Sequence, residues 1–168
     1  MNENSIELDA TDLQLLRQLQ QDAGLSNQAL ARKLHLSPPT CLRRVKRLQS
    51  LKLIEKQVAI LNPEPLARLT GHGLQAIVEV SLDRQDSTSL LQFEQKAVAE
   101  PCVQQCWRVS PGPDFVLVVA TVDMPAYLGL SQKLFTQDAN VRNVKAFFSV
   151  KRAKFSTELP LPETQCNR

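Results

Sequence analysis

A run of basic residues near the N-terminus is the feature of this sequence most able to do chemistry. Between Arg32 and Lys56 the chain has eight lysines and arginines against one acidic residue, Glu55, a local balance of +7. Guanidinium and ammonium groups gathered in this way are typical of a surface that meets phosphate. From residue 63 to residue 168 the chain has eleven basic and eleven acidic residues. The two parts are therefore expected to have different partners, and the first is expected to bind a polyanion.

Three short helical patterns position this charge. The first has Asp9 or Thr11 as its N-cap, the latter with Gln14 as a capping-box partner, and an apolar stripe follows. The second begins after Ser26, and the third begins after Ser37.

Pro38 stands at the first position of the third helix, where its missing N–H costs nothing. Only His35 and Leu36 separate the second helix from Ser37. Two short helices joined by so tight a turn, with a stabilising helix before them, are typical of a helix-turn-helix.

The third helix has two kinds of face. Leu42, Val45 and Leu48 recur at i, i+3 and i+6 and are expected to pack inward. The residues at i, i+3, i+4 and i+7 are expected to project outward into a DNA major groove: Thr40, Arg43, Arg44 and Arg47. Arginine bonds guanine bidentately or pairs with phosphate, and the start of the helix can receive a phosphate on free N–H groups. The candidate DNA-contacting residues are Ser37, Pro38, Thr40, Arg43, Arg44, Lys46 and Arg47.

This stretch resembles the Lrp/AsnC family of bacterial transcription regulators, also called feast/famine regulatory proteins. The likeness comprises Leu8-Asp9 with Asp12, Leu15-Leu16, Leu19, Leu30-Ala31, the run Leu36-Ser37-Pro38-Pro39-Thr40-Cys41-Leu42-Arg43-Arg44-Val45-Lys46-Arg47-Leu48, and Leu53-Ile54. Where the family usually ends this helix with glycine, Lys52 stands instead. If that position needs a left-handed backbone, lysine is tolerated at a local cost of about 1 kcal/mol. The resemblance implies a sequence-specific transcriptional regulator.

From Leu74 onward the period of the pattern changes. Residues 74–82 alternate between apolar and polar, which predicts a strand with one buried face. Ser89 and Gln92 predict a capping box at the start of a helix. The apolar pattern beyond it predicts strands over 103–109, 115–122 and 141–150, and a second helix over 124–135. The order βαββαβ predicts a ferredoxin-like unit with helices on one face of an antiparallel sheet. The fold class is therefore α+β, with a three-helix, winged-helix-like domain at the N-terminus.

The other face of this sheet has no helix to cover it. Apolar residues there favour face-to-face pairing, so we expect a homodimer or a higher, even-numbered homo-oligomer. A dimer presents two recognition helices related by a twofold axis. We therefore expect double-stranded DNA with a near-palindromic operator as the partner.

The βαββαβ order is also that of the effector-binding, dimer-forming domain of the resembled family, so the likeness extends from about residue 8 to residue 161. It implies an amino-acid or related small-molecule effector at the turn after the second strand, which in the family commonly reads Thr-Gly-x-x-Asp-Tyr. The matching candidates here are Ser110, Pro111, Gly112 and Asp114. Pro111 removes a backbone donor, so a changed specificity and the absence of an effector both stay open. A turn that only closes a hairpin capped by Asp114 is equally open.

Two other functions are weighed beside this one. The first is a sirohaem-decarboxylase-like enzyme, since those enzymes resemble this chain in their two-domain architecture. The nearest candidates here for groups around a tetrapyrrole cleft are His72, Arg108 and Tyr127. The intact basic helix favours DNA binding over catalysis. An architectural DNA-binding protein without an effector is the third possibility, and it would bind many sequences with similar affinity.

No metal, cofactor or membrane is expected. No suitably spaced ligands surround His35 or His72, and Cys102 and Cys106 lie too far apart on a strand to pair at zinc. No apolar run approaches the roughly 18 residues of a membrane-spanning helix, and the first residues do not read as a signal peptide. A reducing, cytoplasmic location is expected, with four free thiols: Cys41, Cys102, Cys106 and Cys166.

Prolines and glycines place the domain boundaries. We expect a helix-turn-helix domain over residues 1–61, a linker over 62–73, a sheet domain over 74–161 and a tail over 162–168.

Overall fold

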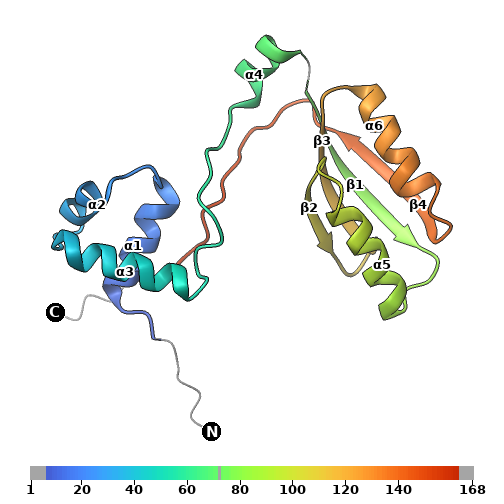
Figure 1. Cartoon of the computed structure of the whole chain (residues 1–168). Coiled ribbons are helices and arrows are strands. Elements are labelled where there is room, and N and C mark those ends of the chain that lie inside the picture. Colours follow the sequence, from blue (N-terminus) through green and yellow to red (C-terminus); the bar gives the residue numbers. More distant parts are fainter. Residues whose placement is uncertain (1–6, 72, 163–168) are drawn as a thin grey trace, which may run out of the picture. The chain divides into compact units, whose positions relative to one another are not determined.

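The computed structural model describes residues 7–71 and 73–162, and these form two compact units. One unit contains the described residues up to Ile60 together with the C-terminal segment from Lys154, and the other runs from Leu61 to Ala153 (Figure 1). The predictions for His72 and Cys166 fall outside the described residues.

The helical unit has three helices, α1 (Ala10–Gln21), α2 (Asn27–Lys33) and α3 (Pro38–Ser50). Ser26 and Ser37 cap α2 and α3 as predicted, because each side-chain oxygen accepts a backbone N–H three residues ahead. Of the two caps predicted for α1, the structure has Asp9, which forms a reciprocal capping box with Asp12.

The core of this unit is small and apolar, and its fully buried members are Leu15, Leu30, Ala31, Cys41 and Leu48. The prediction that Leu42 packs inward is wrong, since that side chain is 44% exposed. Cys41 lies inward instead, because Cys41, Val45 and Leu48 are spaced i, i+4 and i+7 and so share one face of α3.

Two residues of the helical unit have left-handed backbone. His35, in the turn between α2 and α3, has φ of 54°, and Lys52, just after α3, has φ of 56°. The left-handed conformation considered for Lys52 is confirmed. Both side chains have a Cβ, so both positions are strained relative to glycine.

The sheet unit has the predicted order of elements. These are β1 (Leu74–Leu82), α5 (Ser87–Val98), β2 (Val103–Arg108), β3 (Phe115–Thr121), α6 (Met124–Ser131), a π-helical turn (Gln132–Thr136) and β4 (Val141–Phe148). The strands form one sheet in the order β2-β3-β1-β4, and every neighbouring pair is antiparallel. This is the α+β, ferredoxin-like arrangement expected from the sequence.

Helices α5 and α6 cover one face of this sheet (Figure 1). Their side chains Phe93, Ala97, Tyr127 and Leu130 pack on alternate residues of the central strands, such as Leu117. The helix α5 begins earlier than the predicted capping box at Ser89. Its N-cap is Asp86, whose carboxylate accepts the backbone N–H groups of Thr88 and Ser89.

The segments joining and following the units differ from expectation. Residues 62–73, expected to be a linker, contain helix α4 (Pro63–Thr70), which has no buried residue. Residues 154–162, most of them expected in the sheet domain, group with the helical unit. The position of residues 154–162 depends on contacts with α1, and local sequence patterns do not indicate such contacts.

Candidate nucleic-acid interface

The exposed residues of α3 include a stripe of four at i, i+4, i+7 and i+11: Pro39, Arg43, Lys46 and Ser50. It lies opposite the buried face formed by Cys41 and Leu48. Two basic side chains therefore stand at the centre of the surface that α3 presents to solvent.

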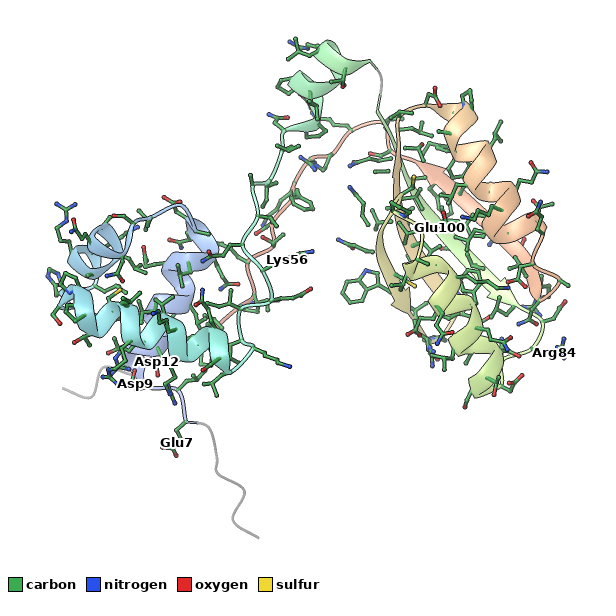
Figure 2. The ribbon with its side chains drawn as sticks, in the orientation of Figure 1. Glu7, Asp9, Asp12, Lys56, Arg84 and Glu100 are labelled. Carbon is green, nitrogen blue, oxygen red and sulfur yellow. The ribbon has the colours of Figure 1, made fainter. Side chains whose placement is uncertain are left out.

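Basic residues outside α3 extend this charge, and those that are exposed include Arg32, Lys33, Lys52 and Lys56. Lys56 lies in the extended chain after α3 (Figure 2). The positive balance read from the sequence is thus largely available at the surface of the helical unit.

Arg44 and Arg47 have a different environment from the exposed stripe. Arg44 Nη1 lies 2.7 Å from Asp9 Oδ2 and 2.8 Å from Asp12 Oδ1. Arg47 Nη1 lies 2.8 Å from Asp12 Oδ2, and its Nη2 donates to the Glu7 carbonyl at 3.2 Å. Figure 2 shows Asp9 and Asp12 beside α3 at the beginning of α1, with Glu7 on the chain that leads into α1. Two of the arginines predicted to point at DNA are therefore bonded to α1.

Asp12 is the centre of this cluster, because it is 1% exposed and both its oxygens accept charged donors. A buried carboxylate is tolerated only when such donors replace water. The hydrogen bonds to Asp12 and then Asp9 raise the pKa of Arg44. Burial opposes the ionisation of Asp9, but the Asp12 N–H and the Arg44 guanidinium outweigh it and lower the pKa of Asp9.

No role was predicted for Asp12, although the sequence contains a signal for one. Asp12 lies at i, i+3 and i+7 with Leu15 and Leu19, on the stripe of α1 that faces the core. An acid on an apolar stripe requires a cationic partner from a neighbouring helix. Arg44 and Arg47 lie on the flank of α3 that faces α1 and so supply it.

The beginning of α3 cannot hold a phosphate in the way that the sequence suggested. Pro38 and Pro39 have no N–H, and the Thr40 N–H donates to Ser37 Oγ at 3.4 Å. The first three helical positions therefore offer no free N–H group. Ser37 Oγ also donates to Thr40 Oγ1 at 2.8 Å, and Asn27 Nδ2 donates to the Pro38 carbonyl at 2.9 Å, so this end is held firmly against α2.

The turn between β2 and β3 contains the effector candidates Ser110, Pro111, Gly112 and Asp114. The first three are exposed, the Ser110–Pro111 peptide is cis, and Gly112 has φ of 121°. Asp114 points toward β1, where its Oδ2 accepts the Leu82 N–H at 2.7 Å. Its own N–H donates to the Val80 carbonyl at 2.9 Å. Asp114 thus fastens the hairpin to the neighbouring strand, and the exposed part of the turn is Ser110 to Gly112.

The groups considered for a tetrapyrrole cleft have other partners. Arg108 Nη2 lies 2.6 Å from Glu94 Oε2, and its guanidinium lies over the Phe115 ring. Tyr127 is buried against Phe148, and burial raises its pKa. These two side chains are engaged in packing the sheet unit.

The described cysteines are free thiols, with Cys41 buried and Cys102 and Cys106 half-buried. Burial, and then the charge of Glu94, raises the pKa of Cys106. Among residues 7–71 and 73–162, no group of three histidine, cysteine, aspartate or glutamate side chains is arranged to hold a metal ion. None of the described helices is both long enough and apolar enough to cross a membrane.

Two family models match the chain. An AsnC-type helix-turn-helix domain matches residues 8–49, and an Lrp/AsnC ligand binding domain matches residues 75–159. The first match contains α1, α2 and the whole of α3 except its last residue, and the second contains the sheet with both of its covering helices.

Similar proteins cover nearly the whole chain. The leucine-responsive regulatory protein of Rhizobium meliloti is 30% identical, over 93% of this chain and 97% of its own. The Bkd operon transcriptional regulator of Pseudomonas aeruginosa is 35% identical, over 92% of this chain and 99% of its own. A crystal structure of a Neisseria meningitidis transcriptional regulator in complex with L-Met superimposes with a TM-score of 0.81 at 30% identity, covering 92% of this chain and 97% of that one.

Proposed function

The chain belongs to the Lrp/AsnC family of DNA-binding transcriptional regulators, and from this we propose that it reads a near-palindromic operator as a homodimer through the exposed face of α3. The family places the helix-turn-helix on DNA, and the ion pairs of α1 decide which residues of α3 are available for reading it.

The observation that carries this proposal is the division of the basic residues of α3 into two groups. Arg43 and Lys46 are exposed on the outward stripe, whereas Arg44 and Arg47 are bonded to Asp12, although the Arg47 side chain is still 42% exposed. Direct reading of base edges or phosphates is therefore assigned to Arg43 and Lys46, with the Ser37 and Thr40 hydroxyls beside them. Arg44 and Arg47 serve the same function by fixing how α3 is held.

Binding-site selection from random duplexes, followed by footprinting of the selected sequence, tests this function. We expect two related half-sites whose centres lie about one helical turn apart or a multiple of it. A selected sequence without twofold symmetry would contradict docking as a dimer. Equal affinity for all duplexes, falling steeply with salt, would identify an architectural protein instead.

The dimer is assigned to the uncovered face of the sheet. In the β-sheet register Val118 faces Ile77 and Ile77 faces Phe147, so apolar side chains run across three strands, and Trp107 pairs with Val116 beside them. Trp107, Ile77 and Phe147 are large and exposed. An apolar patch of this kind, which shares the face with Gln105 and with the facing pair Glu79 and Lys145, is suited to a second copy of itself about a twofold axis.

An amino-acid or related effector is assigned to the turn at Ser110 to Gly112. The Neisseria relative is a complex with L-Met, and the matched family model is described as a ligand binding domain. The Leu82 N–H occupies one acceptor of the turn, Asp114 Oδ2, and Pro111 has no N–H, so the turn also offers one backbone donor fewer than glycine at position 111 would give it. Thermal-shift screening of the amino acids tests this assignment, because a ligand that binds the folded state raises the unfolding temperature. If no amino acid shifts the transition, the amino-acid assignment is wrong.

A further inference from the structure

The C-terminal segment of the chain is bonded to α1 through its backbone. Gln20 Nε2 donates to the Leu159 carbonyl at 3.2 Å, and the Leu159 N–H donates to Gln20 Oε1 at 2.7 Å. Arg17 Nη2 donates to the carbonyls of Leu161 and Pro162. The Gln20 side chain thus bonds both the N–H and the carbonyl of Leu159, as a neighbouring strand would. Arg17, about one turn earlier in α1, bonds the chain after Leu159.

The burial of α1 agrees with this docking. Asp12, Leu15 and Leu19 lie on the side of α1 that faces the helix-turn-helix core, so Arg17 lies on the opposite side and Gln20 on the flank between the two. Residues on the outer side of a surface helix are normally exposed, as Gln14 and Gln21 are here. Arg17 and Gln20 are half-buried instead, because residues 154–162 cover that side.

The docked segment comes directly from the sheet unit. Strand β4 ends at Phe148, and the Ser149 N–H still donates to the Gln75 carbonyl at 2.8 Å. Only residues 150–153 lie between that bond and Lys154, where the chain joins the helical unit. The segment therefore belongs to the helical unit while its chain continues directly from the last strand of the sheet unit, and its docking on α1 is intramolecular.

We propose that residues 154–162 form a strap through which the sheet unit holds α1, and through α1 the recognition helix. On its core side α1 bonds α3 through Asp12, and on its outer side it bonds the strap through Gln20 and Arg17. The units are thus joined by covalent chain after α3 and by the strap after β4. A change at the end of β4 reaches α3 by a route that does not use the α3–β1 connection. Only the last step, from α3 to DNA, rests on the proposed function.

The test uses the full-length protein, Gln20→Ala, and Gln14→Ala as a matched control that removes an exposed glutamine from the same helix. Amide exchange at residue 159, followed by NMR, is expected to be slow in the wild type and in Gln14→Ala. In Gln20→Ala it is expected to be about tenfold faster, because the acceptor of the Leu159 N–H is gone. A chain ending at residue 153 is expected to expose α1 amides that the full chain protects. Equal exchange at residue 159 in all three full-length proteins would overturn the docking.

Operator affinity, measured on the same variants, tests the coupling. Gln20→Ala is expected to bind the selected operator severalfold more weakly than Gln14→Ala, since α1 then keeps only the Arg17 bonds to the strap. Faster exchange at residue 159 with unchanged operator affinity would overturn the coupling and leave the docking intact. If wild type selects no operator while residue 159 is protected, the proposed function fails and the docked segment stands.

Discussion

Arg47 Nη1 lies 2.8 Å from Asp12 Oδ2, and the carboxylate that receives it is 1% exposed on the neighbouring helix. The other oxygen of the same carboxylate accepts Arg44 Nη1 at 2.8 Å. Two arginines of the recognition helix therefore share one buried acid of α1, and this fixes the rotation of α3 about its own axis. The rotation of α3 determines which of its side chains can reach a groove, so we expect Asp12 to contribute to the proposed recognition without facing DNA.

Replacement of Asp12 by alanine is expected to destabilise the helical unit by about 3 kcal/mol. The change leaves Arg44, which is partly buried, with only the exposed Asp9 as an acidic partner, and removes the acid that holds Arg47. Urea unfolding measures the loss. Glu55→Gln, which neutralises an exposed acid of the same unit, is the control and is expected to change stability by less than about 0.5 kcal/mol. Equal stability of the two variants would show that the buried cluster is not stabilising.

Adjacent arginines of α3 are expected to separate DNA binding from stability. Arg43→Ala is expected to weaken operator binding by about 1 to 3 kcal/mol with an unchanged unfolding midpoint, since Arg43 is exposed on the outward stripe. Arg44→Ala is expected to lower the unfolding midpoint, because it leaves Asp12 with one cation. Gel shifts and urea unfolding on both variants distinguish the roles. Selective loss of DNA binding in Arg44→Ala with normal binding in Arg43→Ala would place recognition on the other flank of α3.

The different environments of Arg43 and Arg44 could not be predicted from the sequence. The helix-turn-helix, its two serine caps and the βαββαβ order are encoded locally, in caps, turns and periodicity, and so they could be predicted. The predicted outward face of α3 differs from the observed one by part of a helical turn, because the prediction placed every arginine of α3 in solvent. Arg44 and Arg47 point toward a buried acid, Asp12, that lies some 30 positions earlier in the chain, and local spacing does not indicate such a contact.

The strap is hidden from the sequence for a related reason. Leu159 bonds Gln20 through backbone atoms, which every residue type has, so neither residue type nor spacing indicates the contact. Pro38 and Pro39 show the opposite case. Their missing N–H groups could be read directly, and they already exclude a phosphate site on the first N–H groups of α3.

Acid is expected to weaken the helical unit through Asp9. Burial opposes the ionisation of this carboxyl, but the Asp12 N–H and the Arg44 guanidinium outweigh it, so the folded pKa lies below the unfolded one. A group of this kind contributes stability above its unfolded pKa and loses it as pH falls through its folded pKa. Unfolding free energy should therefore fall as pH drops below about 4. In Asp9→Asn, which keeps an N-cap acceptor, the fall should be shallower. Urea midpoints across this range measure it, and parallel curves for the two proteins would contradict the role of Asp9.

Glycine at position 52 is expected to stabilise the protein. Lys52 has φ of 56°, a left-handed conformation that disfavours a side chain with Cβ by about 1 kcal/mol, and part of this gain is offset by the greater freedom of glycine when unfolded. Lys52→Gly should therefore raise the free energy of unfolding by roughly 0.5 kcal/mol. Lys46→Gly, inside α3, removes the same charge and should lower it by about 1 kcal/mol. Urea unfolding without DNA measures both. Destabilisation of similar size in the two variants would show that the left-handed backbone is not strained.

The proposed dimer is expected to depend on Trp107, a residue that is 57% exposed on the uncovered sheet face of the single chain. On the proposed interface the ring would be buried against the second copy, and its removal by Trp107→Ala would then cost about 2 kcal/mol of association, roughly 30-fold in Kd. Leu91→Ala is the matched control, because Leu91 is also large and exposed but lies on α5, in the layer that covers the other face. Sedimentation equilibrium measures both. Weaker association in Leu91→Ala than in Trp107→Ala would move the interface to the helical layer.

Since a half-site binds one recognition helix, Trp107→Ala should also weaken binding to the full operator more than binding to an isolated half-site.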